Sequence, residues 1–150
     1  MIEKCDKEYI MSLIPHREPM LLIDECEILE DGSVNGHYTI KEDEFFTRGH
    51  FPGNPIVPGV IQCEIMAQTC SMLVRNDIPG HIALYAGLDK VRFKNQIKPG
   101  DVCDIHAILN ETRECGTSKM FFCSATLSVR GKLCCKAEMT FALLPQDAEV

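Results

Sequence analysis

Hydrophobic and polar positions alternate along much of the chain, and one central segment breaks that alternation. The segment GVIQCEIMAQTCSMLVR, residues 59–75, carries apolar or thiol side chains on nearly every side of a helical wheel. A helix that is apolar all round is typical of a buried helix. Pro58 suits the entry to a helix, and DIPG at 77–80 ends it. The pattern therefore predicts one long buried helix near the middle of the chain.

Shorter elements are predicted on both sides of this helix. Residues 1–15 favour a short helix that ends at Pro15, and residues 19–29 and 32–40 favour a β-hairpin. After the helix, strand-like segments are expected at 81–94, 101–113, 118–130 and 132–144. Their short connections imply antiparallel pairing. We predict an α+β fold of one domain, residues 1–150, with an antiparallel sheet wrapped around the helix.

Two residues that carry chemistry flank the start of the helix. Residues 42–59 are rich in Pro and Gly and are predicted to form a loop, and this loop contains His50. The helix carries one carboxylate, Glu64, and burying a carboxylate is costly unless it is paired, hydrogen-bonded or protonated. Gln68 lies one turn later and can bond to it. Because burial raises the pKa of a carboxyl group, we expect Glu64 to be an acid that can donate a proton near neutral pH.

These groups suggest acid–base chemistry at a carbonyl compound. A histidine and a carboxylic acid in one cleft divide the roles of base and acid. Gly59 lies at the helix N-terminus, where free N–H groups favour negative charge and would stabilise an enolate oxygen. This set suits proton abstraction beside a carbonyl with loss of a β-substituent. Taken alone, Glu64 is equally well explained as a structural acid paired with an arginine across a subunit interface.

Charge and length exclude some classes of function. The net charge of −7 provides no basic surface for nucleic acid and disfavours anionic membranes. The apolar runs are too short to span a bilayer, and the opening MIEKCDKEYI lacks the apolar core of a signal peptide. We expect a cytoplasmic protein.

The nine cysteines form no C-x-x-C motif and no Cys/His cluster with zinc-finger spacing. Several lie in apolar runs, where free cysteine behaves as a small buried hydrophobe in a reducing cytosol. A catalytic thiol is the alternative interpretation, and Cys63, next to Glu64, is its best candidate.

Three segments carry a resemblance to a known family. LIPHREPMLLID (13–24), GHFPGNPIVPGVIQCEIMAQ (49–68) and LDKVRFKNQIKPGD (88–101) resemble the (3R)-hydroxyacyl-acyl-carrier-protein dehydratases of bacterial type II fatty-acid synthesis, the FabZ type. The resemblance covers nearly the whole chain in the right order. It implies the hotdog fold, in which an antiparallel sheet wraps around a long central helix. It also implies a homodimer with the active site at the interface, assembled further into a hexamer as a trimer of dimers.

The resemblance also implies roles for single residues. His50 would remove a proton from C2 of the acyl thioester, the Gly59 N–H would polarise the thioester carbonyl, and Glu64 of the other subunit would protonate the leaving C3 hydroxyl. The product would be a trans-2-enoyl thioester, with no metal or cofactor. The phosphopantetheine arm of the acyl carrier protein would deliver the substrate, and its acyl chain would enter an apolar tunnel beside the helix. The further residues expected to bind substrate are Phe51, Pro52, Gly53, Pro58 and Gln68. The residues expected to form a basic rim for the acidic carrier are Arg17, Lys90, Arg92, Lys94 and Lys98.

Some positions depart from the family pattern. Ile65 stands where the family usually has alanine, and Glu18 and Met20 replace a tyrosine and a phenylalanine. These changes affect the expected tunnel and leave the acid–base pair intact. The sister dehydratase/isomerase family has Asp at the position of Glu64, which favours a simple dehydratase.

Related functions are also compatible with the fold. They are those of a dehydratase/isomerase, a polyketide-pathway dehydratase, an acyl thioesterase and a non-catalytic acyl-binding protein. Thioesterases lack the H-F-P-G loop, and a non-catalytic relative would usually have lost His50 or Glu64. Because this chain keeps the loop and both residues, the dehydratase is the favoured interpretation.

Overall fold

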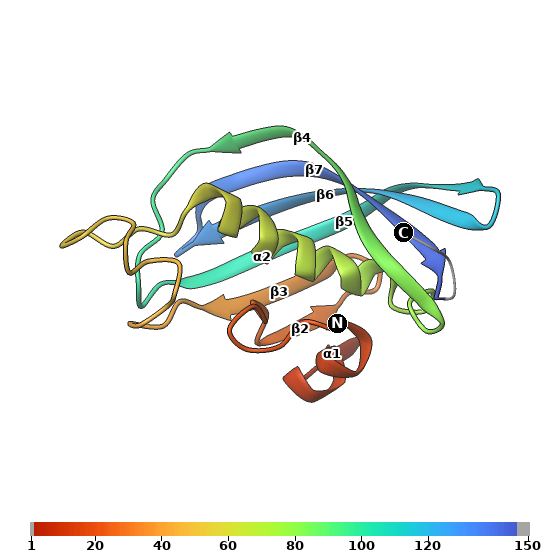
Figure 1. Cartoon of the computed structure of the whole chain (residues 1–150), viewed down its shortest axis with the longest axis horizontal. Helices are drawn as coiled ribbons and strands as arrows, with labels where there is room; N and C mark the ends of the chain where they lie inside the picture. The colour runs from red at the N-terminus through yellow and green to blue at the C-terminus, as the bar shows by residue number, and fades with distance from the viewer. Residues whose placement is uncertain (1, 147–150) are drawn as a thin grey trace.

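The computed structural model describes residues 2–146. It contains an antiparallel sheet of seven strands with one long helix packed against it (Figure 1), which confirms the predicted α+β hotdog arrangement. The strands are β1 (Glu3–Cys5), β2 (Glu25–Ile28), β3 (Val34–Thr39), β4 (His81–Phe93), β5 (Val102–Cys115), β6 (Ser118–Val129) and β7 (Lys132–Pro145). The helices are α1 (Lys7–Leu13) and α2 (Gly59–Ser71), and a 3₁₀ turn, Met72–Val74, follows α2. No helix within residues 2–146 has the length and apolar character needed to cross a membrane.

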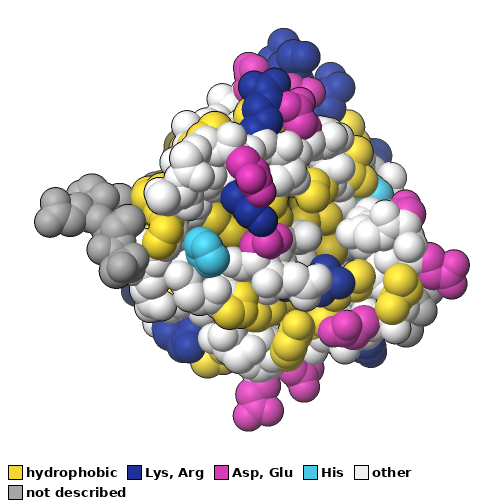
Figure 2. Space-filling view, turned by 90° about the vertical axis from the view of Figure 1, so that its right-hand side faces the viewer, with side chains coloured by type: hydrophobic (Ala, Val, Ile, Leu, Met, Phe, Trp, Pro, Cys, Tyr) yellow, Lys and Arg dark blue, Asp and Glu magenta, His cyan; other side chains and the backbone are white. Residues whose placement is uncertain are grey.

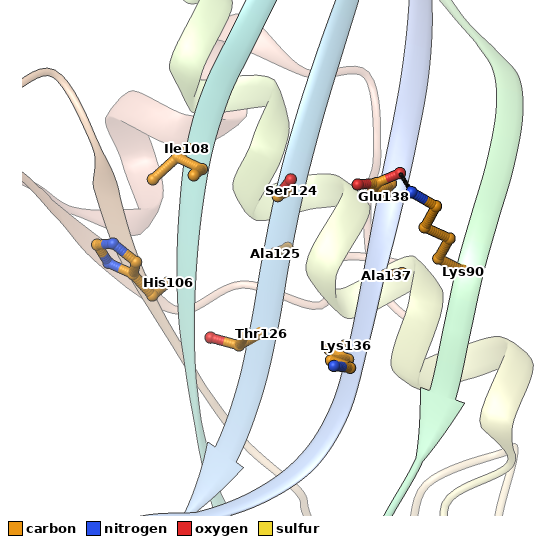
Figure 3. Close-up of a pocket in the computed structure, with 9 residues that line it drawn as sticks. All are labelled: Lys90, His106, Ile108, Ser124, Ala125, Thr126, Lys136, Ala137 and Glu138. Atoms are coloured by element: carbon orange, nitrogen blue, oxygen red, sulfur yellow. Dashed lines mark ion pairs between the residues drawn. The ribbon is translucent and has the colours of Figure 1, made fainter.

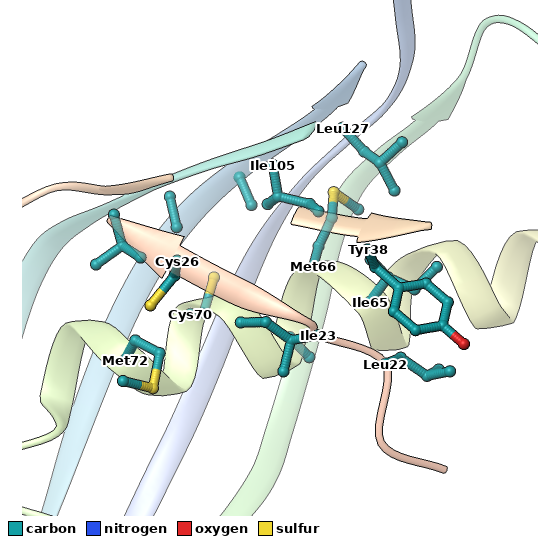
Figure 4. Close-up of a cluster of buried hydrophobic side chains, with 14 of the residues drawn as sticks. Leu22, Ile23, Cys26, Tyr38, Ile65, Met66, Cys70, Met72, Ile105 and Leu127 are labelled. Carbon is teal, nitrogen blue, oxygen red and sulfur yellow. The ribbon is translucent and has the colours of Figure 1, made fainter. Parts of the chain in front are cut away.

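The core lies between α2 and the face of the sheet that it crosses. The helix contacts β3, β5, β6 and β7, and Ile65, Met66 and Cys70 from α2 meet Tyr38 and Ile105 from the sheet (Figure 4). Burying large apolar side chains is the main favourable contribution to folding. All nine cysteines are free thiols, and all except Cys115 are buried, as expected for small hydrophobic core residues.

The N-terminal segment differs from the prediction in two places. The short helix exists, with the Asp6 side chain accepting a hydrogen bond from the Tyr9 N–H at 2.9 Å, a typical N-cap. It is preceded by β1, which pairs with β2 and was not predicted. The predicted strand at 19–29 is a strand only at Glu25–Ile28.

Residues 20–24 form no strand and lie against α2. Leu21, Leu22 and Ile23 are almost fully buried. The Gln68 side chain accepts a hydrogen bond from the Leu22 N–H at 2.7 Å and donates to the Met20 carbonyl at 2.8 Å. A helix side chain therefore satisfies backbone groups that a neighbouring strand would otherwise bind.

The four strands after α2 form in the predicted places, but their order in space differs from their order in sequence. The sheet order is β1-β2-β3-β5-β6-β7-β4, so the connection through α2 leads from β3 to β4 at the far edge beside β7. Within residues 2–146, the other side of β4 has no strand partner. The chain thus presents a strand of thirteen residues as a sheet edge.

Candidate active site

The loop before α2 holds His50 in a defined orientation. The ring Nδ1 lies 3.1 Å from the Ile56 carbonyl oxygen, and the Ile56 N–H donates to the His50 carbonyl at 2.7 Å. Between them, Phe51 and Asn54 exchange backbone hydrogen bonds in a tight turn, where Gly53 has φ +76°. A neutral imidazole that donates from Nδ1 to a carbonyl keeps Nε2 as its acceptor. His50 is therefore arranged to accept a proton at Nε2.

His50 shares a cavity of about 480 Å³ with the start of α2. Gly59 is the first residue of α2, a position whose N–H has no acceptor within its own helix. A Cβ atom at Gly59 would lie 2.8 Å from Cζ of Phe93, so a larger residue at position 59 would require the Phe93 ring to shift away from the helix start. The lining residues are His50, Phe51, Ile56, Val57, Gly59, Gln62, Phe93, Lys94, Asn95 and Gln96. The cavity combines a base with a free helical N–H, which suits a carbonyl compound.

Glu64 lies in a second cavity, of about 180 Å³, further along α2. The Gln68 side chain donates to Glu64 Oε2 at 2.9 Å, and because Gln68 is also bonded to Met20 and Leu22, the carboxylate is firmly placed. The cavity is lined by His16, Glu64, Ala67, Gln68, Ser71, Ala83, Tyr85 and Phe141. Apart from the acid end, this lining is mostly apolar and suits a hydrocarbon chain.

The expected rise in the pKa of Glu64 is wrong for the single chain. Burial raises this pKa, but hydrogen bonds from His16 and Gln68 and the charge of His16 outweigh burial, so the pKa lies below its usual value. Nε2 of His16 lies 3.4 Å from Glu64 Oε2. His16 was not predicted as a site residue, because periodicity does not reveal that this loop reaches α2. The only available signal was its place in the PHREP segment.

The structure brings some of the predicted site residues together and separates others. His50, Phe51 and Gly59 line one cavity, and Glu64 and Gln68 line the other. Pro52 and Gly53 form the exposed turn beside His50, and Pro58 is the N-cap of α2.

The five basic residues expected at the rim do not line one site. Lys94 lines the His50 cavity. Arg17 donates to the carbonyls of Met11, Ile14 and His16 at the end of α1, and Arg92 donates to the Val91 carbonyl. The backbone N–H of Lys98 donates to Asp101.

Lys90 lies apart, on the face of the sheet opposite α2. It pairs with Glu138 at 3.7 Å in a hollow of about 250 Å³ (Figure 3). On the end of the molecule that Figure 2 shows, Lys and Arg side chains are interspersed with Asp and Glu. Of the five residues expected to form a basic rim, Lys94 is the one that lines the His50 cavity.

Solved structures with the same fold include enzymes of two kinds. A dehydratase heterocomplex from Xenorhabdus doucetiae superposes with a TM-score of 0.72 at 19% identity, covering 91% of each chain. A putative thioesterase from Ralstonia eutropha superposes with a TM-score of 0.60 at 20% identity, covering 78% of this chain and 82% of the other. At these identities the likeness concerns the fold.

Sequence comparison is more specific. The family model described as a FabA-like domain matches residues 14–138. A 3-hydroxyacyl-[acyl-carrier-protein] dehydratase FabZ from Clostridium beijerinckii is 42% identical over 140 residues, covering 89% of this chain and 95% of the relative. The FabZ of Bacillus velezensis is 38% identical over 142 residues, covering 92% and 97%. The chain therefore belongs to the FabA-like domain family and, within it, to the FabZ-type 3-hydroxyacyl-[acyl-carrier-protein] dehydratases.

Proposed function

We propose that this chain dehydrates (3R)-3-hydroxyacyl-acyl-carrier-protein to trans-2-enoyl-acyl-carrier-protein in the cytoplasm, as a step of type II fatty-acid synthesis. The observation that carries this proposal is the cavity that His50 shares with Gly59. It supplies a base and an oxyanion donor side by side, and dehydration of a β-hydroxy thioester needs both.

The reaction divides between three groups. Nε2 of His50 removes a proton from C2, and the N–H of Gly59 stabilises the negative charge that develops on the thioester oxygen. The C3–O bond then breaks, and its electron pair leaves with the oxygen. Glu64 supplies a proton to that oxygen, so that water departs and a C2–C3 double bond remains.

We propose that the His50 and Glu64 of one working site come from different subunits. The two residues line separate cavities in the single chain, which supports a site that a second copy completes. The edge strand β4 exposes Tyr85, Leu88 and Phe93, and Phe51 and Val60 are exposed apolar residues of the loop and of α2. An exposed apolar edge strand is a template for pairing. A copy paired along β4 would extend the sheet and cover these side chains, and a hexamer would repeat this dimer three times.

The substrate arrives on the phosphopantetheine arm of the carrier. The acyl chain would run from Glu64 along the apolar lining formed by Ala67, Ala83 and Phe141. Lys94 at the His50 cavity, with Arg92 and Lys98 nearby in sequence, is placed to attract an acidic carrier protein.

The test is incubation of the purified protein with 3-hydroxyacyl carrier substrates of several chain lengths, followed by analysis of the products. We expect trans-2-enoyl products, and we expect His50→Ala to abolish their formation while the oligomer stays folded. Cys63→Ser is the matched control. This variant would lose its activity if the Cys63 thiol were catalytic, and it should keep its activity if Cys63 is only a core residue. Release of free acid and free carrier would instead indicate a thioesterase, and cis-3-enoyl products would show additional isomerisation.

A further inference from the structure

His16 makes contacts that the proposed mechanism leaves unused. It lies in the loop after α1, and its Nε2 is 3.4 Å from Glu64 Oε2. Its Nδ1 is buried and has no hydrogen-bond partner within residues 2–146. Both side chains are largely shielded, with 32% of His16 and 24% of Glu64 exposed. A histidine whose Nε2 faces a shielded carboxylate can share a proton with it.

The remaining surroundings of Glu64 offer no other source of a proton. Gln68 donates to the carboxylate but does not titrate. Tyr85 on β4 lines the cavity, and burial first, and then the negative charge of neighbours including Glu64, raises the pKa of its phenol. On the other side of His16, Arg17 and His81 line a separate cavity of about 480 Å³. Among residues 2–146, His16 is therefore the only titratable group within ion-pair or hydrogen-bond distance of the carboxylate.

Resting on the proposed dehydration, we propose that His16 is a positioning residue that stores the proton which Glu64 delivers to the leaving hydroxyl. In the resting pair, His16 Nε2 carries this proton and Glu64 is ionised. As the C3–O bond breaks, the proton passes from Nε2 through the carboxyl group to the departing oxygen, which leaves as water. His50 holds the proton taken from C2 and returns one to the pair through solvent, so the protons balance over one turnover.

A proton held on His16 would compensate for the low pKa of Glu64. The contacts that place Glu64 also lower its pKa, so alone it would hold little proton at neutral pH. Free glutamic acid and histidine titrate near ~4.3 and ~6.5. A coupled pair therefore retains one proton to a higher pH than a lone carboxyl group does.

The test compares His16→Gln with the unchanged protein across pH 5 to 8. Glutamine can still donate a hydrogen bond to Glu64 but cannot carry a transferable proton. We expect the ratio of kcat/KM, unchanged protein over variant, to rise with pH, from several-fold at pH 5 to roughly 100-fold at neutral pH. Loss of activity through protonation of His50 affects both proteins and cancels in this ratio.

A substrate with a different leaving group controls for folding. Chloride departs from a 3-chloroacyl thioester with its electron pair and needs no proton, so His16→Gln should eliminate it at nearly the unchanged rate, after subtraction of the uncatalysed reaction. His16→Asn is the second variant, with the same expectation. A ratio that stays constant with pH, or equal loss of both eliminations, would overturn the role of His16. An unchanged protein that dehydrates no substrate would overturn the proposed function instead.

Discussion

At the scale of single residues, the chemistry proposed for His50 and Glu64 depends on groups that hold them in place. The Ile56 carbonyl selects the ring tautomer of His50, and Gln68 ties Glu64 to the segment that carries Met20 and Leu22. Neither the Ile56 carbonyl nor the Gln68 side chain takes part in the proposed reaction, but each fixes which atom faces the substrate. Enzymes achieve much of their rate enhancement through such fixed geometry.

Replacing Glu64 by Gln tests its role as the acid. The amide keeps the size of the side chain but removes the group that passes on a proton. We expect a loss of roughly 2–4 kcal/mol of transition-state stabilisation, or about 30- to 1000-fold in kcat/KM. Steady-state kinetics with a 3-hydroxyacyl carrier substrate measures it. Full activity in Glu64→Gln would mean that water or His50 supplies the proton.

The two catalytic candidates were predictable from the sequence, but the charge state of Glu64 was not. His50 and Glu64 stand out because a polar residue in a Gly/Pro-rich loop and an acid in an apolar helix are locally unusual. The pKa of Glu64 depends on His16, which folding brings in from a distant segment. Burial alone gave the wrong direction because it ignored this partner.

At the scale of elements, the contact between β3 and α2 places the helix relative to the sheet. At Gly36 the strand comes so close that a Cβ atom would lie within 3.1 Å of three atoms of Thr69. Thr69 is fully buried, and its hydroxyl has no hydrogen-bond partner within residues 2–146. The close approach therefore depends on the absence of a side chain at position 36.

Gly36→Ala should destabilise the protein by about 1–3 kcal/mol through overpacking. Urea unfolding at fixed protein concentration measures this change. Gly49→Ala is the matched control, because a Cβ atom added at Gly49 would have no neighbour within 4 Å, and its effect should stay within about 0.5 kcal/mol. Adding Thr69→Ala should restore part of the loss in the Gly36 variant. Unchanged stability of Gly36→Ala would show that β3 and α2 can separate freely.

The long elements were predictable because their patterns are strong, and the short ones were not. The all-round apolar pattern located α2 and the 3₁₀ turn after it, and the alternating segments located β4 to β7. The three residues of β1 are too few for a pattern to emerge. Residues 20–24 resemble a strand in sequence, but the side chain of Gln68 binds their backbone instead.

At the scale of the whole molecule, the single chain holds the two proposed catalytic residues, His50 and Glu64, in separate cavities. The sheet order places β4, the strand after α2, at the far edge beside β7. Local patterns cannot give this order, because it follows from pairing between distant segments. The expectation of a site shared between subunits came from the resemblance to FabZ-type dehydratases. The separate cavities of His50 and Glu64 in one chain are compatible with that expectation.

Mixing two inactive variants tests the account most directly. His50→Ala and Glu64→Gln subunits, co-expressed in equal amounts, should form mixed dimers in half of the population. In each mixed dimer one of the two sites combines an intact His50 with an intact Glu64, so the mixture should recover about a quarter of the dehydratase activity of the unchanged protein. Activity no greater than the average of the two variants alone would contradict a site shared between subunits.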